Sequence, residues 1–433
     1  MEEKLSVAPM MDWTHPHWRA FIRGVTRKTV LYTEMAVDST IFYQSHNLDW
    51  FIGKDIYEEP SVIQLGGNRA DELAQAVDIL NTYGNYTEFN LNCGCPSDRV
   101  SKRCFGAKLM LQPELVRQCV YEMSRKTIHP VTVKCRIGVD DHDSYDELTN
   151  FIKVAASGGS KKFIIHARKC LLQGLTTKQN RDVPPLHYDI VHQLQADFPD
   201  LKFIINGGIK SFDMVKEHMA EWNGLPALEG AMIGRQAYAD PMMLANADST
   251  FWGVKDPCPT RRHCIDRYLD YCDWIQGEAE PVLLTRDAPK PPKFTGTLVL
   301  TQVLHSVFKG CDGNGEYMKV LNEQYVKLRK SRNPTAHEIV DAALDVLPDL
   351  DKVLDEPLIN RRIPGIEHLP KEDIKDDFNI DTNNTNTESV FEKIDTTDKV
   401  IEKFEDMTID PLWEEYRNEF QKRNRKIHAR FSY

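Results

Sequence analysis

The run Lys202-Phe-Ile-Ile-Asn206 has an apolar centre, ends on a polar residue and leads directly into Gly207-Gly208. Two earlier runs, Val131–Arg136 and Lys162–His166, repeat this design. Short apolar runs that end at polar or turn residues are typical of buried parallel strands. This pattern decides the fold, because runs of the same kind recur along the first half of the chain.

Eight such runs lie between residues 5 and 235. They are Leu5–Pro9, Val30–Glu34, Ser61–Leu65, Thr87–Leu91, Val131–Arg136, Lys162–His166, Lys202–Asn206 and Gly230–Gly234. Amphipathic segments such as Asp71–Thr82 and Pro113–Lys126 separate most of them. Eight strands alternating with helices over this length predict an α/β fold, a (β/α)8 TIM barrel. A doubly wound sheet is the alternative, but it rarely needs eight evenly spaced parallel strands.

Polar or special residues stand at the ends of these runs. They are Pro9-Met10-Met11, Gln64, Asn90 and Asn92, Lys134 and Arg136, His166 and Arg168, Asn206-Gly207-Gly208 and Gly234-Arg235. In a barrel of this type the carboxyl ends of the strands meet at one mouth, where active sites lie. The sequence therefore predicts a functional site built from these residues.

The chain beyond the predicted barrel (residues 1–250) divides into two further parts. Residues 258–350 contain four helical patterns around a Pro-rich stretch at 277–296, which predicts a small helical domain. Residues 351–433 form an acidic, low-complexity tail with a basic C-terminal end. Residues 351–410 are expected to be disordered, and Trp413–Arg423 fit a terminal helix.

Composition and charge bound the location and the partners. The chain is 41% hydrophobic and 27% charged, and no apolar run is long enough to span a bilayer. The N-terminus lacks the apolar core of a secretory signal, so we expect a cytoplasmic protein; an organellar protein without its presequence would also fit. A net charge of −11 argues weakly against a nucleic-acid partner, but a basic stretch at 421–430 shows that the charge is segregated. Ten cysteines without a CxxC pair are interpreted as reduced thiols and predict no metal site.

The predicted seventh and eighth strand ends carry the signature of a phosphate site. Asn206-Gly207-Gly208 ends one run and Gly234-Arg235 ends the next. Barrels of this type often bind phosphate between these two loops. Glycines let backbone N–H groups approach a phosphate, and an arginine adds a bidentate charge. Gly-Gly alone usually marks a turn, but the two motifs together indicate a phosphorylated cofactor or substrate.

Three further strand-end residues suit a flavin. A cation such as Lys134 would stabilise negative charge on a reduced ring, His166 ends the next run, and Gln64 can hydrogen-bond a ring carbonyl. Simpler interpretations exist for each: a rim salt bridge from Lys134 to Asp140 or Asp141, a buried structural histidine, and a structural amide.

Cys95 lies just beyond the predicted fourth strand, in Asn90-Leu-Asn-Cys-Gly-Cys-Pro-Ser97. A thiol on a rigid turn between Gly94 and Pro96 can act as a general acid if it stays protonated near neutral pH. A buried cysteine in a turn is the simpler interpretation, and spacing alone does not exclude it.

Several segments, taken together, resemble the tRNA-dihydrouridine synthases, and their order is similar to that of the A-type subfamily. They are Ala8-Pro-Met-Met-Asp-Trp13, Asn90–Val100, Cys104–Met110, Thr132–Gly138, Ile165–Lys169, Asn180–Leu186, Ile205–Lys210 and Gly234–Tyr238. The resemblance covers about residues 5–250. It is weaker over 258–345, where His305–Gly310 is similar to the family's helical domain, and it is absent from the tail.

The resemblance implies tightly bound FMN, NADPH as reductant and a uridine of the tRNA D-loop, around position 20 or 20a, as substrate. It also implies that flavin N5 passes hydride to C6 of uracil and that Cys95 gives a proton to C5. The residues that would hold the flavin are Pro9, Met10, Met11, Gln64, Lys134, His166, Asn206, Gly207, Gly208, Gly234 and Arg235. The residues that would contact tRNA are Asn92, Arg168, Lys169, Lys178 and Arg181. The resemblance further suggests a monomer.

Two departures from the family pattern concern the RNA. Lys102-Arg103 stand where the family commonly has Asn-Gly, so extra cations lie in the loop that carries Cys95. The Pro-rich stretch at 277–296 interrupts the predicted helical domain.

Two other functions remain open from the sequence. An FMN barrel reductase of a small molecule, such as an ene-reductase or a dihydropyrimidine enzyme, would share the phosphate site and Lys134. It would not explain the cations Arg168, Lys169, Lys178 and Arg181. A non-catalytic RNA-binding paralogue would have no use for a proton donor such as Cys95.

Overall fold

The computed structural model describes residues 2–45, 48, 52–53, 58–84, 86–279, 296–330 and 333–358. All described residues belong to one compact unit, which lies within Met1–Gly365. Most of the predicted acidic tail and of the Pro-rich stretch lie outside the described residues. Within the described ranges, no helix has the length and apolar character needed to cross a membrane.

Eight parallel strands close into a barrel in chain order, so the (β/α)8 prediction is confirmed. The strands are β1 Leu5–Val7, β2 Val30–Val37, β3 Ser61–Gly66, β4 Glu88–Cys93, β5 Val131–Arg136, β6 Lys162–His166, β7 Lys202–Asn206 and β8 Gly230–Ile233. β1 pairs with both β2 and β8, which closes the sheet.

The strand register brings the predicted strand-end residues to one level. Asn92 on β4 pairs with Lys134 on β5, and Arg136 on β5 pairs with His166 on β6. His166 in turn pairs with Asn206 on β7. These side chains therefore reach the mouth of the barrel from three successive strand pairs.

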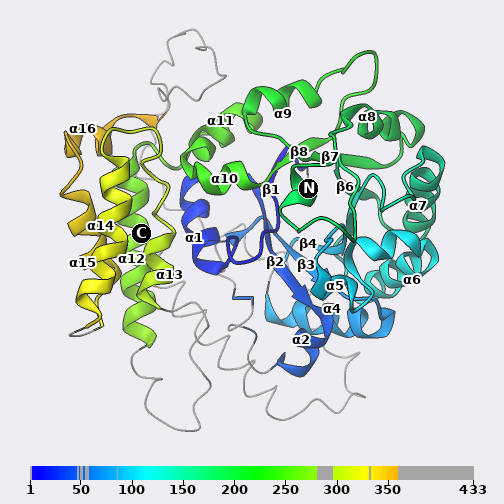
Figure 1. Ribbon diagram of the computed structural model, residues 1–433, viewed down its shortest axis with the longest axis horizontal. Helices are drawn as coiled ribbons and strands as arrows, with labels where there is room; N and C mark the ends of the chain where they lie inside the picture. The colour runs from blue at the N-terminus through cyan, green and yellow to red at the C-terminus, as the bar shows by residue number, and fades with distance from the viewer. Residues whose placement is uncertain are drawn as a thin grey trace, which may run out of the picture. The chain divides into compact units, whose positions relative to one another are not determined.

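Helices follow the strands and cover the barrel (Figure 1). They are α1 Pro16–Val25, α2 Asp38–Tyr43, α4 Ala70–Tyr83, α5 Asp98–Ser101, α6 Pro113–Ser124, α7 Tyr145–Ser157, α8 Tyr188–Asp197, α9 Phe212–His218, α10 Arg235–Ala239 and α11 Ala247–Trp252. Local sequence sets several of their starts. Pro113 stands at the first turn of α6, and Ser144 and Glu147 form a reciprocal capping box at the start of α7.

Two kinds of side chain fill the barrel interior. An apolar cluster occupies its centre: Ala8, Val30, Tyr32, Val62, Ile164, Ile204 and Met232. Below it, at the amino ends of the strands, Lys162 contacts the carboxylates of Glu3 and Glu88, and Thr132 donates a 2.6 Å hydrogen bond to Glu88. This charged floor seals the end of the barrel opposite the mouth.

Among the described residues, five helices follow the barrel: α12 Arg261–Ala279, α13 Thr297–Gln302, α14 Asn314–Leu328, α15 Ala336–Leu344 and α16 Leu350–Asp355. They pack on the barrel through α1. His17 Nδ1 lies 2.7 Å from the Tyr271 hydroxyl, and the rings of Phe21 and Tyr268 meet edge to face at 5.4 Å. Helix α16 continues past residue 350, where the sequence placed the start of the tail.

One pair of cysteines lies close together in the structure. Cys258 and Cys264 stand where α12 begins, with their Cα atoms 5.9 Å apart. The other eight cysteines are free, and most are buried.

Candidate active site

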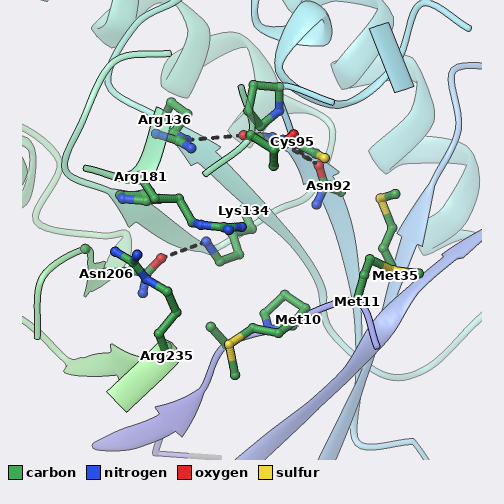
Figure 2. A pocket seen from close by; sticks show the side chains of 18 of the residues that line it. Met10, Met11, Met35, Asn92, Cys95, Lys134, Arg136, Arg181, Asn206 and Arg235 are labelled. Carbon is green, nitrogen blue, oxygen red and sulfur yellow. Dashed lines mark hydrogen bonds between the residues drawn. The ribbon is translucent and has the colours of Figure 1, made fainter. Parts of the chain in front are cut away.

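A cavity of about 810 Å³ opens at the carboxyl ends of the strands. It has the volume of a cofactor site. Fourteen of the sequence-predicted site residues line it: Pro9, Met10, Met11, Gln64, Asn92, Cys95, Lys134, His166, Arg181, Asn206, Gly207, Gly208, Gly234 and Arg235. Figure 2 shows Cys95 and Asn92 on the upper wall, Asn206 and Arg235 at the left with Lys134 between them and Cys95, and Met10 and Met11 below.

Gly207 and Gly208 form a backbone cradle in this cavity. Their φ angles are +110° and +73°, which side-chain-bearing residues rarely adopt. A Cβ on Gly207 would come within 2.7 Å of the His166 ring, and one on Gly208 would meet Leu186 and Tyr188 at 2.7 and 2.8 Å. The Tyr188 hydroxyl donates a 2.8 Å hydrogen bond to the Gly207 carbonyl and fixes the turn.

Arg235 lies beside this cradle and is held by a carboxylate. Its two terminal nitrogens donate to Asp182, at 2.6 and 3.2 Å. The guanidinium holds the pKa of Asp182 below its usual range, first through this hydrogen bond and then through charge. Both side chains are partly exposed, so an incoming anion can compete with Asp182 for Arg235.

Lys134 crosses the cavity floor to Asn206. Its Nζ donates a 2.9 Å hydrogen bond to Asn206 Oδ1, and Asn206 Nδ2 donates to the Met232 carbonyl. Burial, with the neighbouring Arg136 charge, lowers the pKa of Lys134 to about 7. Lys134 thus bonds to an amide, and the alternative rim salt bridge to Asp140 or Asp141 is not formed.

Gln64, Asn92 and Cys95 are connected by hydrogen bonds. Asn92 Nδ2 donates to Gln64 Oε1 at 2.8 Å, and Gln64 Nε2 donates to Asn90 at 2.8 Å. Asn92 Oδ1 accepts the backbone N–H groups of Gly94 and Cys95, at 3.2 and 3.0 Å. Asn92 therefore fixes the turn that presents the Cys95 thiol.

The Cys95 turn is closed from behind by the next loop. The Ala107 N–H donates to the Cys95 carbonyl at 2.9 Å. Gly106, with φ +69°, leaves no room for a side chain because a Cβ would lie 2.6 Å from that carbonyl. Burial raises the pKa of the Cys95 thiol despite the Ser97 N–H and the cations Arg136, Arg181 and Lys134. The thiol is therefore protonated at neutral pH, as a proton donor requires.

His166 and Arg181 carry buried nitrogen atoms that face no protein acceptor. His166 Nε2 and Arg181 Nε have no hydrogen-bond partner within the described part of the chain. Burial, followed by the charges of Arg136 and Lys134, lowers the pKa of His166 well below its usual value, so the imidazole is neutral. Buried polar atoms of this kind are commonly satisfied by a ligand or water.

Three predicted RNA-contacting residues do not line the cavity. Arg168 donates to the Pro184 carbonyl, Lys169 Nζ forms a 2.6 Å ion pair with Asp143, and Lys178 is exposed at the start of a short turn. They lie in the loop between β6 and α8, as Arg181 does, but outside the cavity that Arg181 lines.

Arg136 is a residue whose role the sequence reasoning missed. It lines the cavity and donates to the carbonyls of Gly94, Lys169 and Asn180, at 3.2, 3.4 and 2.9 Å. It therefore ties the Cys95 turn to the loop after β6, as Figure 2 shows for the Gly94 side. The strand period contained the signal, because Arg136 is two residues from Lys134 and so faces the same side of β5. Asp182 was also missed, since no strand pattern fixes its direction.

Within the described residues, no group of three or more His, Cys, Asp or Glu side chains is placed to hold a metal ion.

Comparison with known proteins gives a consistent result. The family model "Dihydrouridine synthase (Dus)" matches residues 6–278. A protein of Vibrio vulnificus named tRNA-dihydrouridine(20/20a) synthase is 44% identical over 62% of this chain and 80% of its own length. Proteins of the same name from Synechocystis sp. and Pseudomonas aeruginosa are 43% and 42% identical, over 78% and 81% of their lengths. Both the extent of the family match and this coverage lead to one conclusion: the chain belongs to the dihydrouridine synthase family.

Proposed function

We propose that this chain is a tRNA-dihydrouridine synthase that reduces a D-loop uridine around position 20 or 20a, with FMN as cofactor and NADPH as reductant. The similar proteins from Vibrio vulnificus and Synechocystis sp. are named tRNA-dihydrouridine(20/20a) synthase. The observation that supports it most is the protonated Cys95 thiol, fixed by Asn92 on the wall of a cavity that also holds Lys134 and a phosphate-type cradle.

The residues present fit FMN. Gly207 and Gly208 leave their backbone open for a phosphate, and Arg235 supplies a charge that only a carboxylate now occupies among the described residues. The buried His166 Nε2 has no partner among those residues, as expected of an atom that a ligand satisfies. Pro9, Met10, Met11, Gln64, Asn206 and Gly234 line the remaining cofactor volume. Bound FMN, once reduced by NADPH, would supply the hydride for C6 of uracil.

The chain's own residues account for the other half of the reduction. Lys134, next to Asn206, would stabilise the negative charge that develops during reduction. Cys95 would donate a proton to C5, and its raised pKa keeps that proton available at neutral pH. Asn92 would hold the thiol in position through its backbone bonds to Gly94 and Cys95.

The substrate base must leave its stack in tRNA to enter the cavity. Arg181 at the cavity wall, and Arg168, Lys169 and Lys178 in the loop after β6, would hold the flanking phosphates and give salt-dependent affinity. We assign the helices of the predicted 258–350 domain to tRNA contact and the 1–250 barrel to catalysis. A cytoplasmic monomer is the expected form.

Reoxidation of the reduced enzyme tests this function against the small-molecule alternative. Protein reduced with one equivalent of NADPH is mixed with unmodified tRNA transcript or with free uridine, and flavin absorbance is followed. We expect rapid reoxidation by tRNA alone. Reoxidation by a free pyrimidine or an enone, with none by tRNA, would favour the small-molecule reductase instead.

A further inference from the structure

We infer a second RNA-docking surface on the opposite side of the mouth from the loop after β6, built on the loops that follow β2, β3 and β4. This surface, the α2 patch, consists of Phe42, Tyr43, Arg69, Lys102 and Arg103. It deepens the proposed function, because it takes the tRNA substrate as its partner.

Two exposed aromatic rings form the centre of the α2 patch. Phe42 and Tyr43 at the end of α2 are 41% and 68% exposed, and their rings meet edge to face at 4.9 Å. Neighbouring apolar rings that stay in water gain free energy when a partner covers them, and exposed apolar patches commonly mark binding surfaces. Aromatic faces stack on unpaired bases with little sequence preference.

Cations adjoin these rings. Helix α2, which ends with these rings, packs against α4, whose N-cap residue is the exposed Arg69. The next residue back, Asn68, donates a 3.2 Å hydrogen bond to the Arg103 carbonyl. The loop after β3 therefore connects the rings to Lys102 and Arg103 in the loop after β4.

Lys102 and Arg103 supply the net positive charge of the patch. Both are exposed, and neither forms an ion pair with a carboxylate of the described residues. Arg69, by contrast, is neutralised by Asp71 and Glu72. Unpaired cations beside exposed aromatic rings fit single-stranded or loop RNA, which presents phosphates and bases together.

The location of the α2 patch fits a flipped nucleotide. All three loops follow carboxyl ends of strands, so they belong to the rim of the mouth. Lys102 and Arg103 lie in the same segment as Cys95, and Met11, which lines the cavity, is 57% exposed. A nucleotide that enters the cavity leaves RNA on both sides of the rim. The loop after β6 would hold one flank, and the α2 patch would hold the other.

Binding of a labelled, unmodified tRNA transcript tests the α2 patch. We would measure fluorescence anisotropy of the full-length FMN-loaded protein without NADPH, over a series of salt concentrations. Phe42→Ala/Tyr43→Ala should weaken binding roughly tenfold with an unchanged salt slope, because it removes stacking and no charge. Lys102→Ala/Arg103→Ala should make the slope of log K against log salt shallower by about 1.5 to 2. Tyr43→Phe, which keeps the ring, should bind like the wild type.

The matched control pair is Tyr121→Ala/Arg125→Ala. Tyr121 is 49% exposed, with Arg125 over its ring at 5.9 Å, near the end of α6 on the face away from the mouth. Flavin content and thermal melting would verify that each variant is folded.

The outcomes separate this inference from the proposed function. If the wild type forms dihydrouridine but both patch variants bind tRNA within twofold of it, or the control pair loses as much, the α2 patch is not an RNA surface. Unchanged tRNA binding with lost binding to anionic lipid vesicles would likewise overturn it in favour of a membrane surface. Weakened tRNA binding by a protein that makes no dihydrouridine would support the patch and reject the proposed reaction.

Discussion

At the scale of single residues, Cys95 carries the sharpest prediction. Its thiol is held on the cavity wall and its pKa is raised by burial, so it stays protonated at neutral pH, as the proposed role of proton donor requires. Cys95→Ala should retain FMN and lose dihydrouridine formation by about 100-fold or more, as for loss of a general acid. Single-turnover assays would measure this. Cys104→Ala, an exposed cysteine in the same segment, is the control, and normal turnover by Cys95→Ala would remove the assigned role.

Substitutions of Arg235 and of Asp182 should have opposite effects on the affinity for FMN. The Asp182 carboxylate accepts the hydrogen bonds of the Arg235 guanidinium, which the proposed phosphate would need. Arg235→Ala should weaken FMN binding roughly tenfold or more, since it removes a charge-assisted hydrogen bond. Asp182→Asn should strengthen it a few-fold by removing a competing anion. Quenching of flavin fluorescence in titrations of FMN-free protein would measure both, and equal affinity in all three proteins would count against the phosphate site.

Lys134 predicts a pH dependence of stability. Burial lowers its pKa to about 7 in the folded state from an ordinary value of 10.5. Between these values the unfolded chain binds more protons, so the free energy of unfolding rises with pH through this window, by at most about 1.4 kcal/mol per unit. Lys134→Met removes this rise. Its stability advantage over the wild type should therefore shrink from pH 7 to pH 10 in urea denaturation of FMN-free protein; a constant difference would contradict the lowered pKa.

At the scale of elements, Arg136 joins two loops through three backbone carbonyls. Arg136→Ala should leave flavin binding intact but loosen the Cys95 turn and the loop that carries Arg181. We expect a kcat at least tenfold lower and a faster alkylation of Cys95 by iodoacetamide, because the thiol becomes more accessible. Arg136→Lys, which cannot reach three carbonyls, should rescue only part of the rate. An unchanged alkylation rate would rule out the positioning role.

The site residues at the strand ends could be predicted from the sequence, whereas the directions of side chains in the loops could not. Gln64, Asn92, Lys134, His166 and Asn206 lie near the carboxyl ends of five strands, and the alternation of side chains along each strand fixes the side of the sheet that each one faces. In the loops after the strands nothing comparable sets direction. Lys169 turns to Asp143, and Arg168 bonds to its own loop, away from the chamber where the sequence had grouped them. Arg136 was predicted only as a strand-end residue of the mouth, because no motif indicated which groups it would contact.

At the scale of the whole molecule, the charged floor of the barrel predicts a stability effect far from the mouth. Lys162 is the cation between the buried carboxylates of Glu3 and Glu88. Lys162→Met would leave both without that partner, and removal of one member of a buried ion pair costs about 3 to 5 kcal/mol. The melting temperature should fall by several degrees, while the flavin affinity of the folded protein stays unchanged. A melting temperature equal to that of the wild type would show that the floor does not depend on this ion pair.

The barrel itself could be predicted because its eight strands share one local pattern, whereas long-range contacts could not. Nothing in the sequence near α1 indicates that the ring of Phe21 will contact that of Tyr268. Helix α16 extends beyond residue 350, where the acidic, low-complexity composition of the tail begins. Tertiary packing sets those features. The extent of the tail and of the Pro-rich stretch stays a prediction outside the described residues.

Dihydrouridine content is the most direct measure of the central claim. Unmodified tRNA transcript is incubated with the purified, flavin-loaded protein and NADPH, and its nucleosides are then analysed by mass spectrometry after site-specific digestion. The account predicts new dihydrouridine in the D-loop around position 20, and its loss with Cys95→Ala. A yellow protein that oxidises NADPH but leaves every uridine unreduced would contradict it.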